Sequence, residues 1–88
     1  MPYTFRPYDR AVIEALGALG RAVALARARQ GMSQEGLEAR SGIDQTTISR
    51  FEGGKAPGLR ADRVAGLLVG LGVDHLDIEL RRDRRRSP

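Results

Sequence analysis

The sequence predicts an all-α domain built from short packed helices, and two observations support this fold class. Apolar residues recur at helical spacings of three and four along much of the 88-residue chain. Glycines follow these periodic segments, at the position where a helix commonly ends. A chain of this length is expected to form one domain around a single core.

The first expected helix begins after Asp9, a residue type that caps helix N-termini well. Gly17 and Gly20 weaken this helix by roughly 1 kcal/mol each relative to alanine. It therefore either breaks near these glycines or runs unbroken to Arg29, and we favour the unbroken helix. Gly31 then ends it. The apolar face follows spacings of four and three through Val12, Leu16, Leu19, Val23 and Ala26.

Two short helices follow, separated by Gly42. Ser33 is expected to cap a helix over residues 34–40, and Asp44 to cap a second helix over residues 45–52. A left-handed backbone conformation, which costs little only at glycine, turns the chain between them. Two helices joined by a short turn containing glycine form the helix-turn-helix pattern. Four apolar residues are expected to fill the core between them: Leu37, Ile43, Ile48 and Phe51.

The rest of the chain predicts one more full helix and a short final one. A fourth helix begins at Leu59 or Ala61, ends at Gly72 and carries Val64, Leu67, Leu68 and Leu71. Asp74 caps a last helical turn that carries Leu76, Ile78 and Leu80. The domain thus spans residues 9–80, with an extended aromatic arm over residues 1–8 and a basic, disordered tail over residues 81–88.

Charge is distributed unevenly, although the formal net charge is only +4. Residues 17–60 carry seven bases and four acids, residues 61–80 carry one base and four acids, and the tail carries five arginines and one aspartate. A basic middle, an acidic segment and a basic tail indicate a polyanionic partner. On composition alone, ordinary solvated surface charge explains the pattern equally well.

Composition argues against several classes of protein. The chain has no cysteine, so disulfides and cysteine-based zinc sites are excluded. No apolar run approaches the roughly 20 residues of a membrane span, and the N-terminus lacks the apolar core of a signal peptide. We therefore expect a cytoplasmic protein with no membrane association.

Residues for catalysis or metal binding are also lacking. His75 is the single histidine, and a metal site needs more ligands at a workable spacing. The G-x-G within "GLLVGLGV" lies at the end of a helix rather than after a strand, so it does not predict a dinucleotide loop. No nucleophile is paired with a base. We expect no enzyme activity, no metal and no cofactor.

The third helix has an unusual outer face. Opposite its buried residues it carries Gln45, Thr46, Ser49 and Arg50. Short polar side chains let a helix axis approach base edges, where glutamine can pair with adenine and arginine with guanine. The alternative is a solvated surface helix, but such a helix more often carries glutamate, lysine and alanine. The face therefore favours readout of DNA in the major groove.

Three segments together resemble the helix-turn-helix domain of the Cro and lambda-repressor family, also called XRE. They are "RQGMSQEGL", "SGIDQTTISRFEGGK" and "LGVD", and the similarity extends over residues 19–80. The resemblance implies a compact five-helix bundle, usually dimeric, that regulates transcription by sequence-specific binding to double-stranded DNA.

The resemblance also implies roles for individual residues. Gln34 is expected at a backbone phosphate, Thr47 near a phosphate or base, and the outer face of the third helix at base edges. Arg27 and Glu52 match a structural ion pair of the family. The full set of expected DNA-binding residues is Gln34, Asp44, Gln45, Thr46, Thr47, Ser49, Arg50 and Lys55.

Three residues depart from the family pattern in the second helix. Glu38 replaces a usual alanine, so this side chain must turn outward or the helix crossing must loosen. Ser41 stands where an apolar residue is common. Gly36 replaces a glutamate and so removes the capping box with Ser33. These departures predict a second helix that is less stable than the average of the family.

The leading functional interpretation is a regulator that binds a palindromic operator as a homodimer, either a small repressor or an antitoxin with a toxin partner. Dimer contacts are expected from the arm (Tyr3, Phe5, Tyr8) or the last turn (Leu76, Ile78, Leu80). One alternative is a protein-interaction adaptor that keeps the fold, for which Glu38 and the acidic segment would be suited. Another is nonspecific DNA compaction by the arginine tail.

Overall fold

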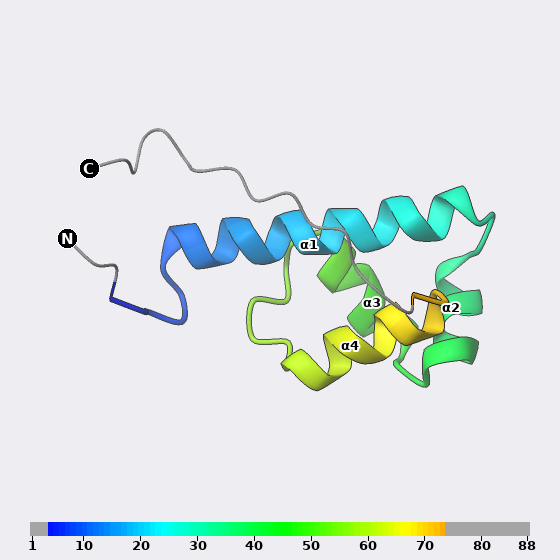
Figure 1. The fold of residues 1–88 in the computed structure, drawn as a ribbon. Helices are drawn as coiled ribbons and strands as arrows, with labels where there is room; N and C mark the ends of the chain where they lie inside the picture. Colours follow the sequence, from blue (N-terminus) through cyan, green and yellow to red (C-terminus); the bar gives the residue numbers. More distant parts are fainter. Residues whose placement is uncertain (1–3, 74–88) are drawn as a thin grey trace.

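The computed structural model describes residues 4–73, and this part of the chain contains four helices and no strand (Figure 1). They are α1 (Arg10–Arg29), α2 (Gln34–Ser41), α3 (Gln45–Glu52) and α4 (Ala61–Gly70). The long α1 runs along one side of the molecule, and the three shorter helices pack beneath it. The all-α prediction is confirmed here. The expected fifth helix after Asp74 and the basic tail lie outside the described residues.

Helix α1 is continuous, as favoured from the sequence. Its N-terminus is capped by Asp9, whose Oδ1 accepts a hydrogen bond of 2.8 Å from the amide of Ala11. At the other end, Gly31 adopts a left-handed conformation with φ of 65°, and the helix stops. The 20 residues span about 30 Å, because an α-helix rises about 1.5 Å per residue.

The two glycines of α1 form part of its buried face, a role that the apolar spacing did not predict. Gly17 and Gly20 are buried, whereas Leu19 is 36% exposed. At Gly20, a Cβ atom would overlap the carbonyl oxygen of Phe51 and lie 2.9 Å from its carbonyl carbon. Helix α1 therefore crosses the C-terminal end of α3 with backbone almost against backbone. The glycines cost helix propensity but permit this close approach.

The helix-turn-helix forms as expected. Ser33 caps α2 by accepting a hydrogen bond of 2.9 Å from the amide of Gly36. Gly42 follows α2 with φ of 76°, a left-handed conformation that favours glycine, and Asp44 then caps α3. The sequence therefore predicts both ends of the turn correctly.

The core lies between all four helices, and its buried apolar residues are Val23, Leu37, Ile43, Ile48, Phe51, Leu67 and Leu71. The four residues expected in the helix-turn-helix core are all present. Helix α4 packs closely on α2, since a Cβ atom at Gly70 would lie 3.1 Å from Cδ1 of Leu37 and 3.0 Å from Cβ of Ser41. The small Ser41 thus permits a close contact between helices.

The part of the arm that the structure describes leaves its aromatic side chains uncovered. Phe5 is 68% exposed and Tyr8 is 71% exposed. A hydrogen bond of 3.1 Å from the amide of Asp9 to the carbonyl of Arg6 turns the chain into α1. Between residues 4 and 73, no helix combines the length and the apolar character that crossing a membrane requires.

The crossing of α1 and α3 predicts opposite effects for two Gly→Ala substitutions on one helix. Gly20→Ala should lower the free energy of unfolding by roughly 2–3 kcal/mol, because the new methyl group meets backbone that cannot move aside. Gly17→Ala should be neutral or stabilise by up to about 1 kcal/mol, since its methyl group meets the flexible end of Arg21 at 3.4 Å and Cα of Gly54 at 4.0 Å, an ordinary contact distance. Chemical denaturation of both variants provides the comparison. Equal stabilities would contradict the close crossing.

Candidate nucleic-acid interface

The interface is built around α3, whose two faces differ sharply. Ile48 and Phe51 point into the core, with 0% and 1% of their surface exposed. The four side chains expected at base edges are all exposed: Gln45, Thr46, Ser49 and Arg50. The core residues therefore fix which side of α3 faces outward, and that side is polar along its whole length.

Asp44 holds the start of α3. Its Oδ2 accepts a hydrogen bond of 2.9 Å from the amide of Thr47, and its Oδ1 accepts one of 2.8 Å from the Thr47 hydroxyl. These two bonds lower the pKa of the Asp44 carboxyl below its ordinary value. The contacts describe a helix cap, and they also fix the orientation of the Thr47 side chain. Contact between either residue and DNA remains a prediction.

A bidentate ion pair joins α1 to the end of α3. Nε and Nη2 of Arg27 donate to the two carboxylate oxygens of Glu52 at 2.8 and 2.9 Å, which confirms the pairing implied by the family resemblance. Nη1 of Arg27 also donates to the carbonyl of Met32 at 2.8 Å. The Glu52 side chain is only 7% exposed and that of Arg27 only 18%. This pair is therefore largely removed from water.

Burial by itself would raise the pKa of Glu52, but hydrogen bonds from Arg27 and Gln34, together with the charge of Arg27, lower it overall. The hydrogen bonds to Glu52 and the charge of that carboxylate raise the pKa of Arg27, although burial acts in the opposite direction. Both groups therefore remain charged near neutral pH, and each depends on the other for its stability inside the protein.

Gln34 has a contact that the sequence did not predict. Its Nε2 donates to Oε1 of Glu52 at 2.9 Å, so the side chain ties the first residue of α2 to the last residue of α3. The family pattern suggested a phosphate contact, and this bond occupies one donor of the amide. A shallow hollow of about 350 Å³ lies beside this link, lined by Gln34, Gln45, Thr46, Ser49 and Arg50.

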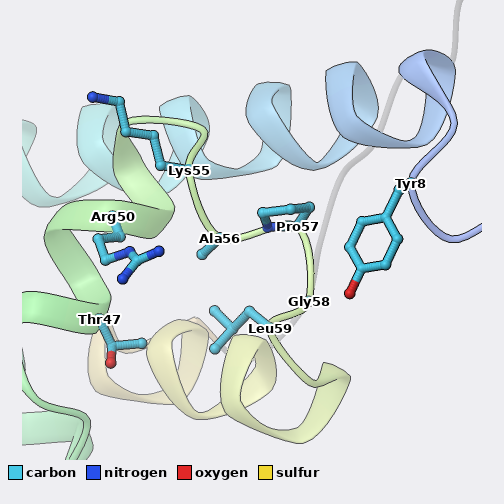
Figure 2. Close-up of a pocket in the computed structure, with 8 residues that line it drawn as sticks. All are labelled: Tyr8, Thr47, Arg50, Lys55, Ala56, Pro57, Gly58 and Leu59. Carbon is cyan, nitrogen blue, oxygen red and sulfur yellow. The ribbon is translucent and has the colours of Figure 1, made fainter.

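A second hollow of about 410 Å³ lies on the other side of Arg50 (Figure 2). Thr47 and Arg50 line it from α3, and the loop between α3 and α4 closes it with Lys55, Ala56, Pro57, Gly58 and Leu59. Tyr8 stands across the hollow from Arg50, with its hydroxyl directed toward the loop at Gly58. The backbone amide of Lys55 donates to the carbonyl of Arg50 at 2.8 Å, which holds the loop against the helix end.

Seven of the eight expected residues line the two hollows, and Arg50 is shared between them. The eighth, Asp44, lines neither hollow but is hydrogen-bonded to Thr47, which lines the second. Sequence reasoning missed Tyr8 as a lining residue of this hollow, having considered the aromatic arm only as one of two possible dimer contacts. The sequence did contain a signal for Tyr8. This residue comes directly before Asp9, the N-cap of α1, so it must lie close to the start of that helix. The loop residues Pro57 and Gly58 were also missed.

Comparison with known proteins gives one match. The family model described as a helix-turn-helix domain matches residues 18–82, which is more than half of the chain. The match begins well inside α1, so the first eight residues of that helix precede it. Searches of curated proteins and of solved structures returned no significant match.

The buried ion pair predicts a strong dependence of stability on Glu52. Glu52→Ala should lower the free energy of unfolding by roughly 3 kcal/mol at neutral pH, because it leaves the charge of Arg27 buried and unpaired. The stabilising effect of Glu52 is present above its ordinary pKa of 4.5 and is lost as the pH falls through its lower folded value. The difference between wild type and Glu52→Gln should therefore shrink in acid.

Thermal denaturation from pH 7 down to pH 2 measures this difference. Asp62→Asn serves as the control, because Asp62 pairs with Arg60 at 3.0 Å in an exposed ion pair and should change stability little. If Glu52→Ala and Asp62→Asn have equal stabilities at neutral pH, the Arg27 pair does not hold the helices together.

Proposed function

Because the chain belongs to the helix-turn-helix domain family, of the Cro and lambda-repressor type, we propose that it is a sequence-specific regulator of transcription. The family is one of DNA-binding rather than catalytic domains, and membership covers residues 18–82. The proposal concerns how this chain reads DNA and in which assembly it does so.

The observation that supports sequence-specific readout is the outer face of α3. It carries short polar side chains and one arginine, while Ile48 and Phe51 fix its orientation from inside. Arg50 can pair bidentately with guanine and Gln45 with adenine, and Thr46 and Ser49 are short enough to let the helix axis approach the bases. Binding driven by charge alone requires none of these side chains.

The surroundings of α3 suit the DNA backbone. Lys55 is exposed in the loop after α3, and the hollow between Arg50 and Tyr8 offers a cation and a hydroxyl to a phosphate. In this assignment Asp44 acts through its cap on α3, and Gln34 acts through its link to Glu52. Phosphate contacts of this kind set the register of a domain on the duplex, whereas base contacts set specificity.

The proposed binding unit is a homodimer on a palindromic operator. One short helix reads only a few base pairs, which gives too little discrimination against competing genomic sites. Two copies related by a two-fold axis would read half-sites about one helical turn apart. A regulator of this kind acts in the cytoplasm, as a repressor or as an antitoxin that controls its own operon. We further propose that its DNA-binding unit spans residues 9–80.

Selection of bound sequences from random DNA duplexes tests the whole proposal. A palindromic motif with two half-sites is the expected result. A non-palindromic motif would contradict the dimeric reading of the operator. Absence of duplex binding at low salt would instead point to an adaptor that keeps the fold and binds proteins.

Substitutions at base-reading positions should weaken specific binding in a local manner. Arg50→Ala and Gln45→Ala should each cost about 1–3 kcal/mol and relax the preference at one base pair of each half-site. Arg40→Ala is the matched control, because Arg40 is exposed near the end of α2 and stands outside both hollows. Unchanged specificity in the Arg50 and Gln45 variants would rule out base readout by α3.

Lys55 should act on affinity and leave specificity unchanged. Lys55→Ala should weaken binding to all sequences alike and reduce the slope of log affinity against log salt by about 1. Tyr8→Phe removes only a hydroxyl, so it should weaken binding slightly without changing that slope. Titrations of duplex DNA at several salt concentrations measure both effects. A salt slope that Lys55→Ala leaves unaltered would remove Lys55 from the interface.

A further inference from the structure

The outward face of α1 is apolar along most of its length. Ala15, Ala18, Ala22 and Leu25 are exposed on it, and Ala11 is half-buried at its start. These five residues follow one another at spacings of four, three, four and three. That is the seven-residue repeat by which two helices pack along a shared seam. No charged residue interrupts the seam between Ala11 and Leu25.

The two flanks of this seam differ. One flank carries larger apolar side chains, of which Leu19 is 36% exposed and Val12 is half-buried. On the seam itself, Leu25 is 52% exposed. The opposite flank carries the charged residues Glu14 and Arg21, both exposed and seven positions apart. A helix that needed only its own core would have no reason to keep so wide an uncharged face toward solvent.

The position of this face within the fold also requires an explanation. Its first half lies on the N-terminal turns of α1, which extend past the other three helices in Figure 1. The family match begins at residue 18, so these turns precede the matched segment. Full burial within α1 begins only at Gly17, where the helix meets α3. The added turns thus contribute little to the core.

We propose that a second copy of this chain covers the face, with the two α1 helices packed antiparallel along the alanine seam. This inference rests on the proposed dimeric regulator and names its contact surface. In the pairing, Ala15 lies opposite the partner's Ala18, and Ala11 lies opposite the partner's Ala22. Alanine at every one of these positions lets the two helix axes approach closely.

Charge complementarity selects this arrangement. In this register Glu14 faces the partner's Arg21, and the two-fold axis repeats the pair. Glu14 already accepts a hydrogen bond of 3.2 Å from Arg10, an exposed residue, and the partner's guanidinium adds a further cation beside the same carboxylate. A shift of one heptad would place Arg21 opposite the partner's Arg21. A parallel pair would place the charged flank of one helix against the apolar flank of the other.

The other flank fits the same register. Val12 meets the partner's Leu19 on one side of the two-fold axis, and Leu19 meets the partner's Val12 on the other. The exposed Leu19 and the half-buried Val12 are therefore both covered by the pairing that forms the two ion pairs. One register thus satisfies the seam, the charged flank and the apolar flank together.

The symmetry of this pair also suits a single DNA duplex. The two-fold axis stands perpendicular to the plane of the paired helices, so a surface on one flank of α1 points the same way in both copies. A Cβ atom at Gly17 would lie 3.4 Å from Nη1 of Arg21 and 4.0 Å from Cα of Gly54. Gly54, two residues after α3, therefore lies on the charged flank, and both copies present it in the same direction.

Charge reversal in the full-length chain provides the first test. Sedimentation equilibrium should show that Glu14→Arg and Arg21→Glu each raise the dimer dissociation constant about tenfold, because two attractive contacts become repulsive. The double variant should restore the affinity of the wild type. Arg40→Glu makes the same change of charge away from α1 and should have no effect. Single variants that dimerise like wild type, or a wild type that stays monomeric at high micromolar concentration, would overturn the pairing.

Disulfide cross-linking provides the second test, and it reports the register directly. The natural chain has no cysteine, so introduced thiols are the only ones present. In a mixture of the Ala15→Cys and Ala18→Cys chains, disulfides between the two different chains should form faster than disulfides between two identical chains. Ala28→Cys, which is exposed but off the seam, should cross-link with neither. Preferential pairing of Ala18→Cys with Ala22→Cys would show the shifted register and contradict the proposal.

Other occupants of the face give different results. If the aromatic arm or the segment after residue 73 forms the dimer, the α1 cysteines will not cross-link and charge reversal will leave the dimer intact. DNA binding is measured separately on the same variants. Loss of duplex binding with intact cross-linking would contradict the proposed function alone, while specific binding by a chain that does not pair through α1 would contradict this inference alone.

Discussion

The bidentate pair of Arg27 and Glu52 is the contact on which the geometry of the binding region depends. It joins the last turn of α1 to the last residue of α3, and Gln34 adds the first residue of α2 to the same carboxylate. Three helices therefore meet at one acid whose side chain is largely removed from water. The hydrogen bonds outweigh the cost of burial, since the pKa of Glu52 is lowered rather than raised. The polar face of α3 is thus held from inside by a charge network.

Local chemistry made much of this fold predictable. The caps Asp9, Ser33 and Asp44 and the left-handed glycines after α1 and α2 depend only on neighbouring residues, so the sequence indicates them directly. The outer face of α3 could be predicted equally well from the sequence, because two large apolar residues, Ile48 and Phe51, determine its opposite side. Pairing of Arg27 with Glu52, which lie 25 positions apart, was anticipated only through resemblance to a known family.

The features that the sequence did not indicate depend on how closely the helices pack against one another in the folded protein. The burial of Gly20 leaves no apolar signal, because glycine has no side chain, and the spacing of larger residues pointed to Leu19 instead. The bond between Gln34 and Glu52 and the position of Tyr8 beside Gly58 likewise depend on how the helices cross. Once the core is known, a second set of apolar residues with the same spacing, from Ala11 to Leu25, can be recognised as the outward face of α1.

The backbone contact at Gly20 has a mechanical consequence. No side chain lies between α1 and the carbonyl of Phe51 at this point, so no rotamer change can absorb a displacement of one helix against the other. Helices α1 and α3 are therefore expected to move together as one rigid unit. In an assembly joined through α1, the angle at which the two copies cross would set the separation and tilt of the two α3 helices. The spacing of the operator half-sites would then depend on how the two α1 helices pack, although these helices make no contact with DNA in this arrangement.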